Sequence, residues 1–143
     1  MNLYIGIDWS SSKHDAVMSN EQGAVIAGFA FPHSADGFLR FDAQRATTGV
    51  SAADCLVGIE TAYSLLIDFL WDHAYQQVYI VPPILVKSER RGQHPSGAHT
   101  DQSDAALLAD LVQRKRSLLR RWQPDSALTR QIQARISYRL FLS

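Results

Sequence analysis

The chain has 143 residues, 46% of them hydrophobic and 20% charged, which is the size and composition of one ordinary globular domain and excludes a disordered chain. A single cysteine, Cys55, excludes an internal disulfide, and no stretch approaches the roughly 18 uncharged apolar residues of a membrane span. The net charge is zero, but residues 1–86 carry three basic and nine acidic side chains, whereas residues 87–143 carry eleven basic and five acidic ones. The basic part suits a polyanionic partner and the acidic part a cation, while a solvated helical surface explains the basic residues equally well.

The first third of the chain predicts three strands and a helix. Leu3–Asp8 is a short apolar run, and residues 14–19 and 24–31 flank a turn-like segment, as in an antiparallel meander. Ser34 is then a suitable N-cap for an amphipathic helix that ends before Gly49.

The middle of the chain predicts alternating strands and helices. Residues 55–60, CLVGIE, form a continuous apolar run that suits a strand covered on both faces and ends in an acid. Residues 63–74 have apolar side chains at helical spacing, and residues 77–81 form another strand before a proline pair. We expect residues 84–100 to be a mobile loop with a short helical start.

Two more helices are predicted in the C-terminal part. From Thr100 the apolar residues recur at helical spacing, and Thr100 or Asp101 is well placed as the N-cap. Beyond Pro124 a last helix has a narrow apolar seam at steps of four residues, which fits either core packing or contact with a second subunit. The seam consists of Leu128, Ile132, Ile136 and Leu140.

The resulting order, βββαβαβα, is that of the RNase H-like (RuvC-like) α/β fold, a mixed five-stranded sheet in which the fourth strand lies parallel beside the first. In such a sheet Asp8, at the end of the first strand, and Glu60, at the end of the fourth, emerge at the same edge. Asp101 and Asp104 are three residues apart at the start of a helix, so they share one face of it. We therefore expect one cluster of four carboxylates.

Four carboxylates in one place repel one another unless protons or cations neutralise them. Oxygen ligands without cysteine or paired histidine suit Mg²⁺ or Mn²⁺ rather than Zn²⁺. Two such ions, roughly 3.5 to 4 Å apart, can activate an attacking oxygen and stabilise the leaving oxygen of a phosphodiester. Each acid alone fits an ordinary strand end, solvated side chain or helix cap, so it is the joint placement that indicates nuclease chemistry.

Three segments carry a family resemblance: YIGID at Asp8, GIETAY at Glu60, and HTDQSDAALLADL, which contains Asp101 and Asp104. They resemble the insertion-sequence transposases with a DEDD-type, RuvC-like catalytic domain, which are relatives of the pilin-gene invertase and are described as bridge-RNA-guided recombinases. The spacing TD-x-x-DA-x-x-LA is the most specific element, and the resemblance covers essentially the whole chain.

The resemblance implies a DNA transposase or recombinase in which the four acids hold Mg²⁺, or Mn²⁺, for strand cleavage and transfer. It also implies DNA and a structured guide RNA as partners, and a dimer or tetramer formed through the C-terminal helix. By this resemblance residues 1–122 are the catalytic domain and residues 123–143 begin a helical linker. Family members have a further domain whose serine works with the acids, so we expect a fragment, inactive alone if that serine is required, and we assign no nucleophile.

Basic residues flank the acidic helix, and we predict that they contact phosphates. They are Lys87, Arg90, Arg91, Arg114, Lys115, Arg116, Arg120 and Arg121. Trp122 suits base stacking or, as we favour, hydrophobic packing. His94 and His99 are near the acids in sequence, but we interpret them as solvated loop residues outside the catalytic set.

Two other functions stay open. IGIDWSSSK, residues 5–13, resembles the phosphate loop of actin-like ATPases and sugar kinases. The chain has no second Gly-rich phosphate loop, however, and therefore offers no place for adenosine. The other alternative is a non-catalytic fragment that binds nucleic acid and dimerises. The N-terminus lacks the basic start of a signal peptide, so we expect a bacterial cytoplasmic protein that associates with the nucleoid when bound to DNA.

Overall fold

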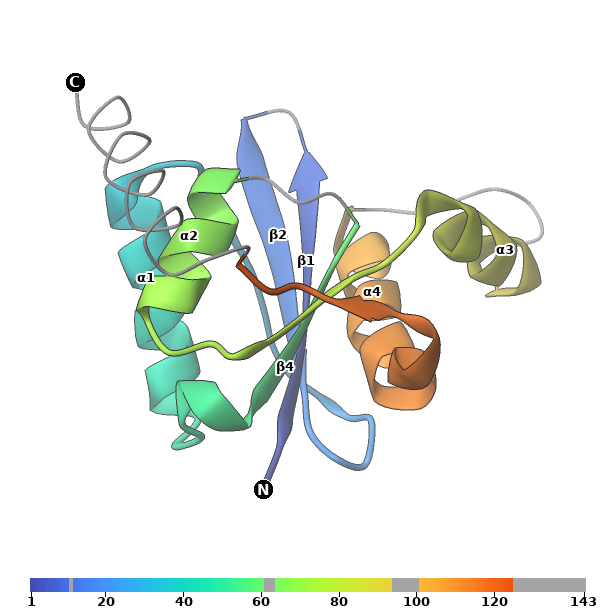
Figure 1. Ribbon diagram of the computed structural model, residues 1–143, viewed down its shortest axis with the longest axis horizontal. Coiled ribbons are helices and arrows are strands. Elements are labelled where there is room, and N and C mark those ends of the chain that lie inside the picture. Colours follow the sequence, from blue (N-terminus) through green and yellow to red (C-terminus); the bar gives the residue numbers. More distant parts are fainter. Residues whose placement is uncertain (11, 61–63, 94–100, 125–143) are drawn as a thin grey trace.

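The computed structural model describes residues 1–10, 12–60, 64–93 and 101–124, and it contains a sheet with helices on both faces (Figure 1). The strands are β1 (Leu3–Ser10), β2 (Lys13–Ser19), β3 (Val25–Pro32), β4 (Cys55–Ile59), β5 (Gln77–Ile80) and β6 (Arg120–Arg121). The helices are α1 (Ala35–Thr47), α2 (Ser64–Asp72), α3 (Pro83–Gln93) and α4 (Asp101–Lys115), with short 3-10 turns η1 (Ala52–Asp54) and η2 (Arg116–Leu118).

The strands lie side by side in the order β3-β2-β1-β4-β5-β6. β1, β2 and β3 form the predicted antiparallel meander, and β4 lies parallel to both β1 and β5. The predicted RNase H-like arrangement of a mixed sheet is therefore confirmed. β6 is a sixth, two-residue strand, antiparallel to β5, that was not predicted from the sequence.

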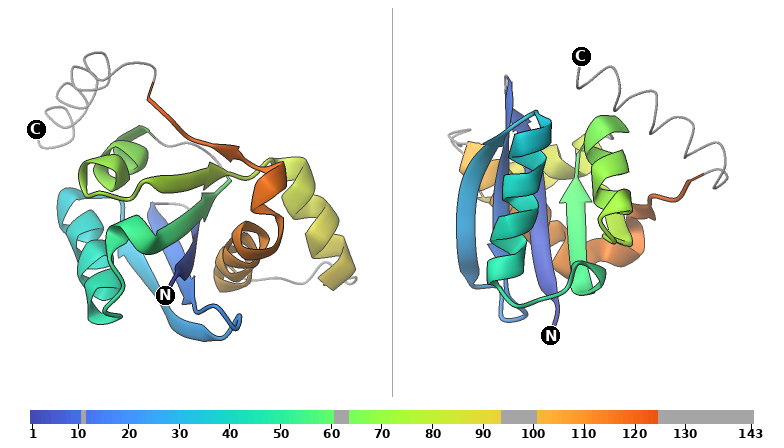
Figure 2. Two further views of the ribbon diagram at one scale, coloured as in Figure 1. Left: turned by 60° about the horizontal axis from the view of Figure 1, so that its bottom comes forward. Right: turned by 90° about the vertical axis from the view of Figure 1, so that its left-hand side faces the viewer.

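One face of the sheet is covered by α1 and α2, and the other by α4, against which α3 packs (Figure 2). The core under α1 and α2 is rich in aromatic side chains, among them Phe31, Phe38 and Phe41. Ser34 caps α1 as predicted, because its Oγ accepts a hydrogen bond of 3.0 Å from the Gly37 amide. Trp122 packs against this core, so the packing interpretation of its role is confirmed.

On the other face, two glycines allow α4 to approach the sheet closely. Gly6 on β1 and Gly58 on β4 are register partners. A Cβ atom on Gly6 would overlap the carbonyl oxygen of Ala105 and lie 2.6 Å from the amide nitrogen of Ala109, and one on Gly58 would lie 2.9 Å from the oxygen of Leu108. Only glycine leaves room for a helix backbone at this depth.

The contacts of α4 also fix its direction. Its Ala105 lies over Gly6, whereas its Val112 clusters with Tyr4 near the start of β1. The helix therefore runs antiparallel to β1, and its N-terminal turn lies toward the end of β1 that carries Asp8.

Residues 83–93 form the helix α3, where a loop with only a short helical start was expected. Pro83 occupies the first helical position, at which a missing amide hydrogen costs little. Val86 is buried against Leu107, Leu108 and Leu111 of α4, and this tertiary contact stabilises a helix that local sequence alone does not predict.

Several expectations fall outside the described residues. These are the remainder of the predicted loop with His94 and His99, and the last helix with its seam of Leu128, Ile132, Ile136 and Leu140. Within the described ranges, none of the helices has the length and apolar composition to cross a bilayer.

Candidate active site

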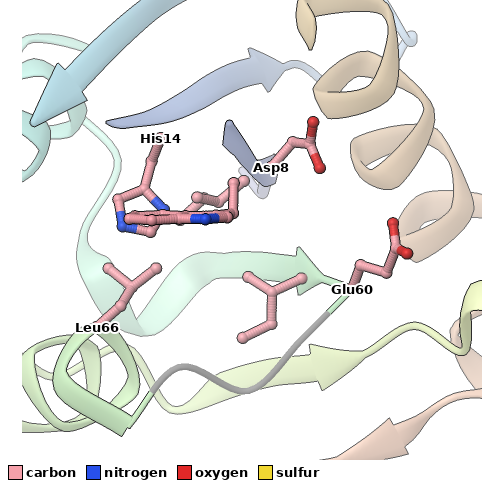
Figure 3. Close-up of a pocket in the computed structure, with 7 residues that line it drawn as sticks. Asp8, His14, Glu60 and Leu66 are labelled. Atoms are coloured by element: carbon pink, nitrogen blue, oxygen red, sulfur yellow. The ribbon is translucent and has the colours of Figure 1, made fainter. Parts of the chain in front are cut away.

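The site begins with two acids at one edge of the sheet. Ile7 and Ile59 are the last register partners of the parallel pair β1–β4, and Asp8 and Glu60 follow them directly. Successive side chains alternate between the faces of a strand, so Asp8 lies on the same face as Gly6, under α4. Figure 3 shows that the carboxylates of Asp8 and Glu60 point to the same side. The predicted juxtaposition of these two acids is therefore present.

A pocket of about 110 Å³ lies beside the two acids (Figure 3). Its lining residues are Ile7, Asp8, Trp9, His14, Ile59, Glu60 and Leu66. A space of this size holds ions or a few water molecules, whereas organic ligands of nucleotide size occupy roughly 300 to 1,000 Å³. This small pocket gives no support to the ATPase or sugar-kinase alternative.

His14, which sequence reasoning did not single out, lines the same pocket. Its side chain is only 1% exposed, and its Nε2 is 2.9 Å from the Nδ1 of His33. Burial, with a smaller contribution from His33, lowers the pKa of His14 to about 4. At neutral pH this imidazole is therefore uncharged and adds no positive charge next to the acids.

Asp104, on the first turns of α4, is held by an arginine from α3. The Nη2 of Arg90 is 2.8 Å from Oδ1 of Asp104, and the two side chains are 24% and 13% exposed. Asp101 is the first residue of α4, but its side chain lies outside what the structure describes. Among the described residues, no group of three His, Cys, Asp or Glu side chains is gathered closely enough to hold a metal ion.

A fifth acid, Asp15, was missed from the sequence. It lies on β2 directly opposite Asp8, so the two side chains share a face, and it is 4% exposed. The sequence could have indicated this neighbour, because the antiparallel register that pairs Ser10 with Lys13 also pairs Asp8 with Asp15.

The predicted phosphate-contacting residues differ in their surroundings. Besides Arg90, two of them are held in ion pairs with acids: Arg114 with Asp110 and Glu89, and Lys115 with Glu89. Arg121 donates two hydrogen bonds to the carbonyl oxygen of Gln76, at 2.7 and 3.1 Å. Of the remaining predicted residues, Lys87, Arg116 and Arg120 are exposed and form no ion pair within the described part of the chain, while the side chain of Arg91 is not described.

The sheet order and the paired acids at the ends of β1 and β4 define a domain of the RNase H-like DEDD class. A family model described as a transposase, the DEDD transposase of the IS110 type, matches residues 5–143, and the chain belongs to this family. A curated relative from Streptomyces coelicolor, named "Mini-circle putative transposase for IS117", is 26% identical over 92% of the chain. The chain spans about a third of that relative's length, 32%.

A DEDD transposase domain implies a divalent metal, and the donors present suit one. Asp8, Glu60 and Asp104 offer only carboxylate oxygens, which are the ligands that Mg²⁺ and Mn²⁺ prefer. The guanidinium group on Asp104 already stands where a cation would be bound by this carboxylate. The chemistry of these donors therefore suits a divalent metal, although among the described residues they are not gathered into a group of three.

Proposed function

We propose that this chain is the metal-dependent strand-cleaving domain of a DNA transposase, with Asp8, Glu60, Asp101 and Asp104 as ligands of Mg²⁺ or Mn²⁺. The observation that carries the proposal is the position of Asp8 and Glu60 side by side at the ends of parallel strands, on the face that α4 covers. Family membership supplies the class of reaction.

When bound, the metal would polarise a phosphate oxygen and favour cleavage of the phosphodiester. The chain's own residues hold and orient the reactants. Gly6 and Gly58 admit α4 to the depth at which Asp104 approaches the sheet edge. The exposed side chains of Lys87, Arg116 and Arg120 can bind phosphates by charge, and such binding does not depend on the sequence of the nucleic acid.

Further partners follow from the family resemblance of the motifs. We propose that the complete protein acts on DNA at the bacterial nucleoid, uses a structured guide RNA, and assembles into a dimer or tetramer through residues 123–143. We also propose that a serine from a further domain completes the site, so that the acidic domain by itself binds metal and nucleic acid but cleaves slowly or not at all.

A second candidate is a non-catalytic fragment that binds nucleic acid. The Arg90–Asp104 ion pair supports it, because an acid neutralised by a guanidinium group is a poor metal ligand. Metal binding separates the two candidates, since a pure binding module needs no divalent cation.

The test is Mn²⁺ titration by calorimetry on the wild-type chain and on Asp8→Asn and Glu60→Gln, with folding checked by circular dichroism. A matched control, Asp36→Asn, removes an exposed acid from α1 on the other face of the sheet. We expect Mn²⁺ binding to be lost in the two site variants and kept in the control. Equal binding by all four proteins, or none by the wild type, would contradict the metal site.

A further inference from the structure

The ion pair between Arg90 and Asp104 joins α3 to a proposed metal ligand. We propose that the Arg90 guanidinium and a divalent metal ion are alternative partners of the Asp104 carboxylate. Arg90 then holds the acid in the metal-free chain, and metal binding requires its displacement. The inference rests on the proposed function, because it presupposes that Asp104 is a metal ligand.

The geometry shows a cation in direct contact with the carboxylate. Arg90 donates to Oδ1 of Asp104 over 2.8 Å, a distance typical of a charge-assisted hydrogen bond. A divalent ion bound to the same carboxylate would lie close to the guanidinium group, and the two positive charges would repel each other. Mg²⁺ also requires oxygen ligands around it, which a guanidinium group cannot supply. The two cations therefore compete.

The Arg90 side chain is incompletely satisfied in its present position. Its Nε atom is buried and has no hydrogen-bond partner within the described residues. A buried donor without a partner costs free energy, so the pair with Asp104 does not use the full capacity of the guanidinium fork. Displacing Arg90 by another cation therefore costs less free energy than it would if every N–H group of the guanidinium were hydrogen-bonded.

Helix α3 remains attached to α4 when Arg90 leaves. The neighbouring residue, Glu89, forms ion pairs with Lys115 and Arg114 near the other end of α4. Val86 is buried in the apolar cluster with Leu107, Leu108 and Leu111. These contacts are independent of Asp104, so displacement needs only a rotamer change of Arg90 and not the undocking of a helix.

The displaced side chain would remain beside the site. Lys87 lies one turn earlier on the same helix and is exposed. A phosphate group of nucleic acid is the natural new partner for the guanidinium group, because its oxygens can accept the hydrogen bonds that Arg90 no longer donates to Asp104. Metal and phosphate would then support each other's binding.

The first test is Mn²⁺ calorimetry on wild type and Arg90→Gln, with Arg40→Gln as a control that removes the same charge from α1 on the other face. We expect roughly fivefold tighter binding by Arg90→Gln and no change in Arg40→Gln. Unchanged or weaker binding by a folded Arg90→Gln, with Asp8→Asn still abolishing it, would overturn the exchange and leave the metal site standing. Absence of binding in both wild type and Arg90→Gln would overturn both proposals.

A second measurement needs no variant of uncertain folding. In a Mg²⁺ titration of the wild-type chain followed by NMR, the Nε–H resonance of Arg90 should shift with the same midpoint that calorimetry gives for Mg²⁺. The resonance of Arg45, which is held by Asp42, Tyr75 and the carbonyl of Val50, is the internal control and should stay in place. A stationary Arg90 resonance at saturating Mg²⁺ would overturn the exchange.

Discussion

Gly6 and Gly58 are direct partners in the parallel pair β1–β4, and a Cβ atom on either one would collide with α4. Asp8 and Glu60 follow these glycines by two residues. Close packing of α4 and the placement of the acids are therefore parts of one arrangement, in which the glycine pair sets the distance between the helix and the sheet edge.

Gly6→Ala is expected to destabilise the protein by about 3 kcal/mol or more, because the new methyl group meets helix backbone that cannot rotate away. Urea denaturation measures the loss, and Mn²⁺ binding should weaken in the fraction that remains folded. Gly49→Ala is the control: Gly49 has a positive φ of 80° but no neighbour within 4 Å of a Cβ, so we expect a cost of only about 1 kcal/mol. Equal costs at both glycines would contradict the close-packing argument.

Tyr75→Phe should destabilise the fold without affecting the site. The Tyr75 hydroxyl donates to Asp42 over 2.7 Å and accepts from Arg45 Nε over 3.1 Å, and phenylalanine keeps the ring packing. The expected loss is about 1 to 2 kcal/mol in the free energy of unfolding, with unchanged Mn²⁺ affinity. Tyr79→Phe serves as the comparison, because the hydroxyl of Tyr79 has no hydrogen-bond partner among the described residues, and it should cost less.

His14 should make the protein less stable in acid. Its pKa is lowered to about 4 in the folded chain, whereas in the unfolded chain it is close to 6.5. The unfolded chain therefore takes up a proton first as pH falls, so stability is full above about pH 6.5 and is lost progressively toward pH 4, by up to about 3 kcal/mol. The ionisable side chains of His33, Asp8 and Glu60 lie near His14. The measured quantity is therefore the difference in the free energy of unfolding between wild type and His14→Gln. This difference should shrink as the pH falls, and a constant difference would disprove the prediction.

Glu89→Gln should increase binding to nucleic acid. Lys115 and Arg114 are paired with Glu89, and the hydrogen bond from Lys115 lowers the pKa of that carboxyl. Their release adds phosphate contacts, so we expect severalfold tighter DNA binding at low salt and a steeper dependence of affinity on salt concentration. The free energy of unfolding should change by less than about 1 kcal/mol, because the pairs are partly solvated. Asp36→Asn removes one negative charge elsewhere and should change DNA affinity much less.

The parts of the fold that follow from local patterns were predictable. The alternating and continuous apolar runs predicted the five main strands, and Ser34 marked the start of α1. The parallel pairing of β1 with β4, and hence the meeting of Asp8 and Glu60, followed from the order of elements. β6 could not be predicted, because two arginines have no strand preference and pair only where β5 presents a free edge.

Other features depend on contacts between distant segments. The full length of α3 requires the burial of Val86 against α4, and its sequence alone is compatible with a loop. A series of basic residues does not reveal which members are neutralised, so the pairing of Arg90 with Asp104 and of Lys115 with Glu89 was not predicted. Asp15 is a different case, because the register that pairs it with Asp8 is local and could have been inferred from the sequence.

The most direct test of the central claim is a crystal structure of the chain grown with saturating Mn²⁺ and measured for the anomalous signal of manganese. We predict a peak coordinated by the carboxylates of Asp8 and Glu60, with Asp104 turned from Arg90 toward the metal. Crystals that show no manganese at this sheet edge, with Arg90 still bound to Asp104, would contradict the assignment of these acids as a metal site.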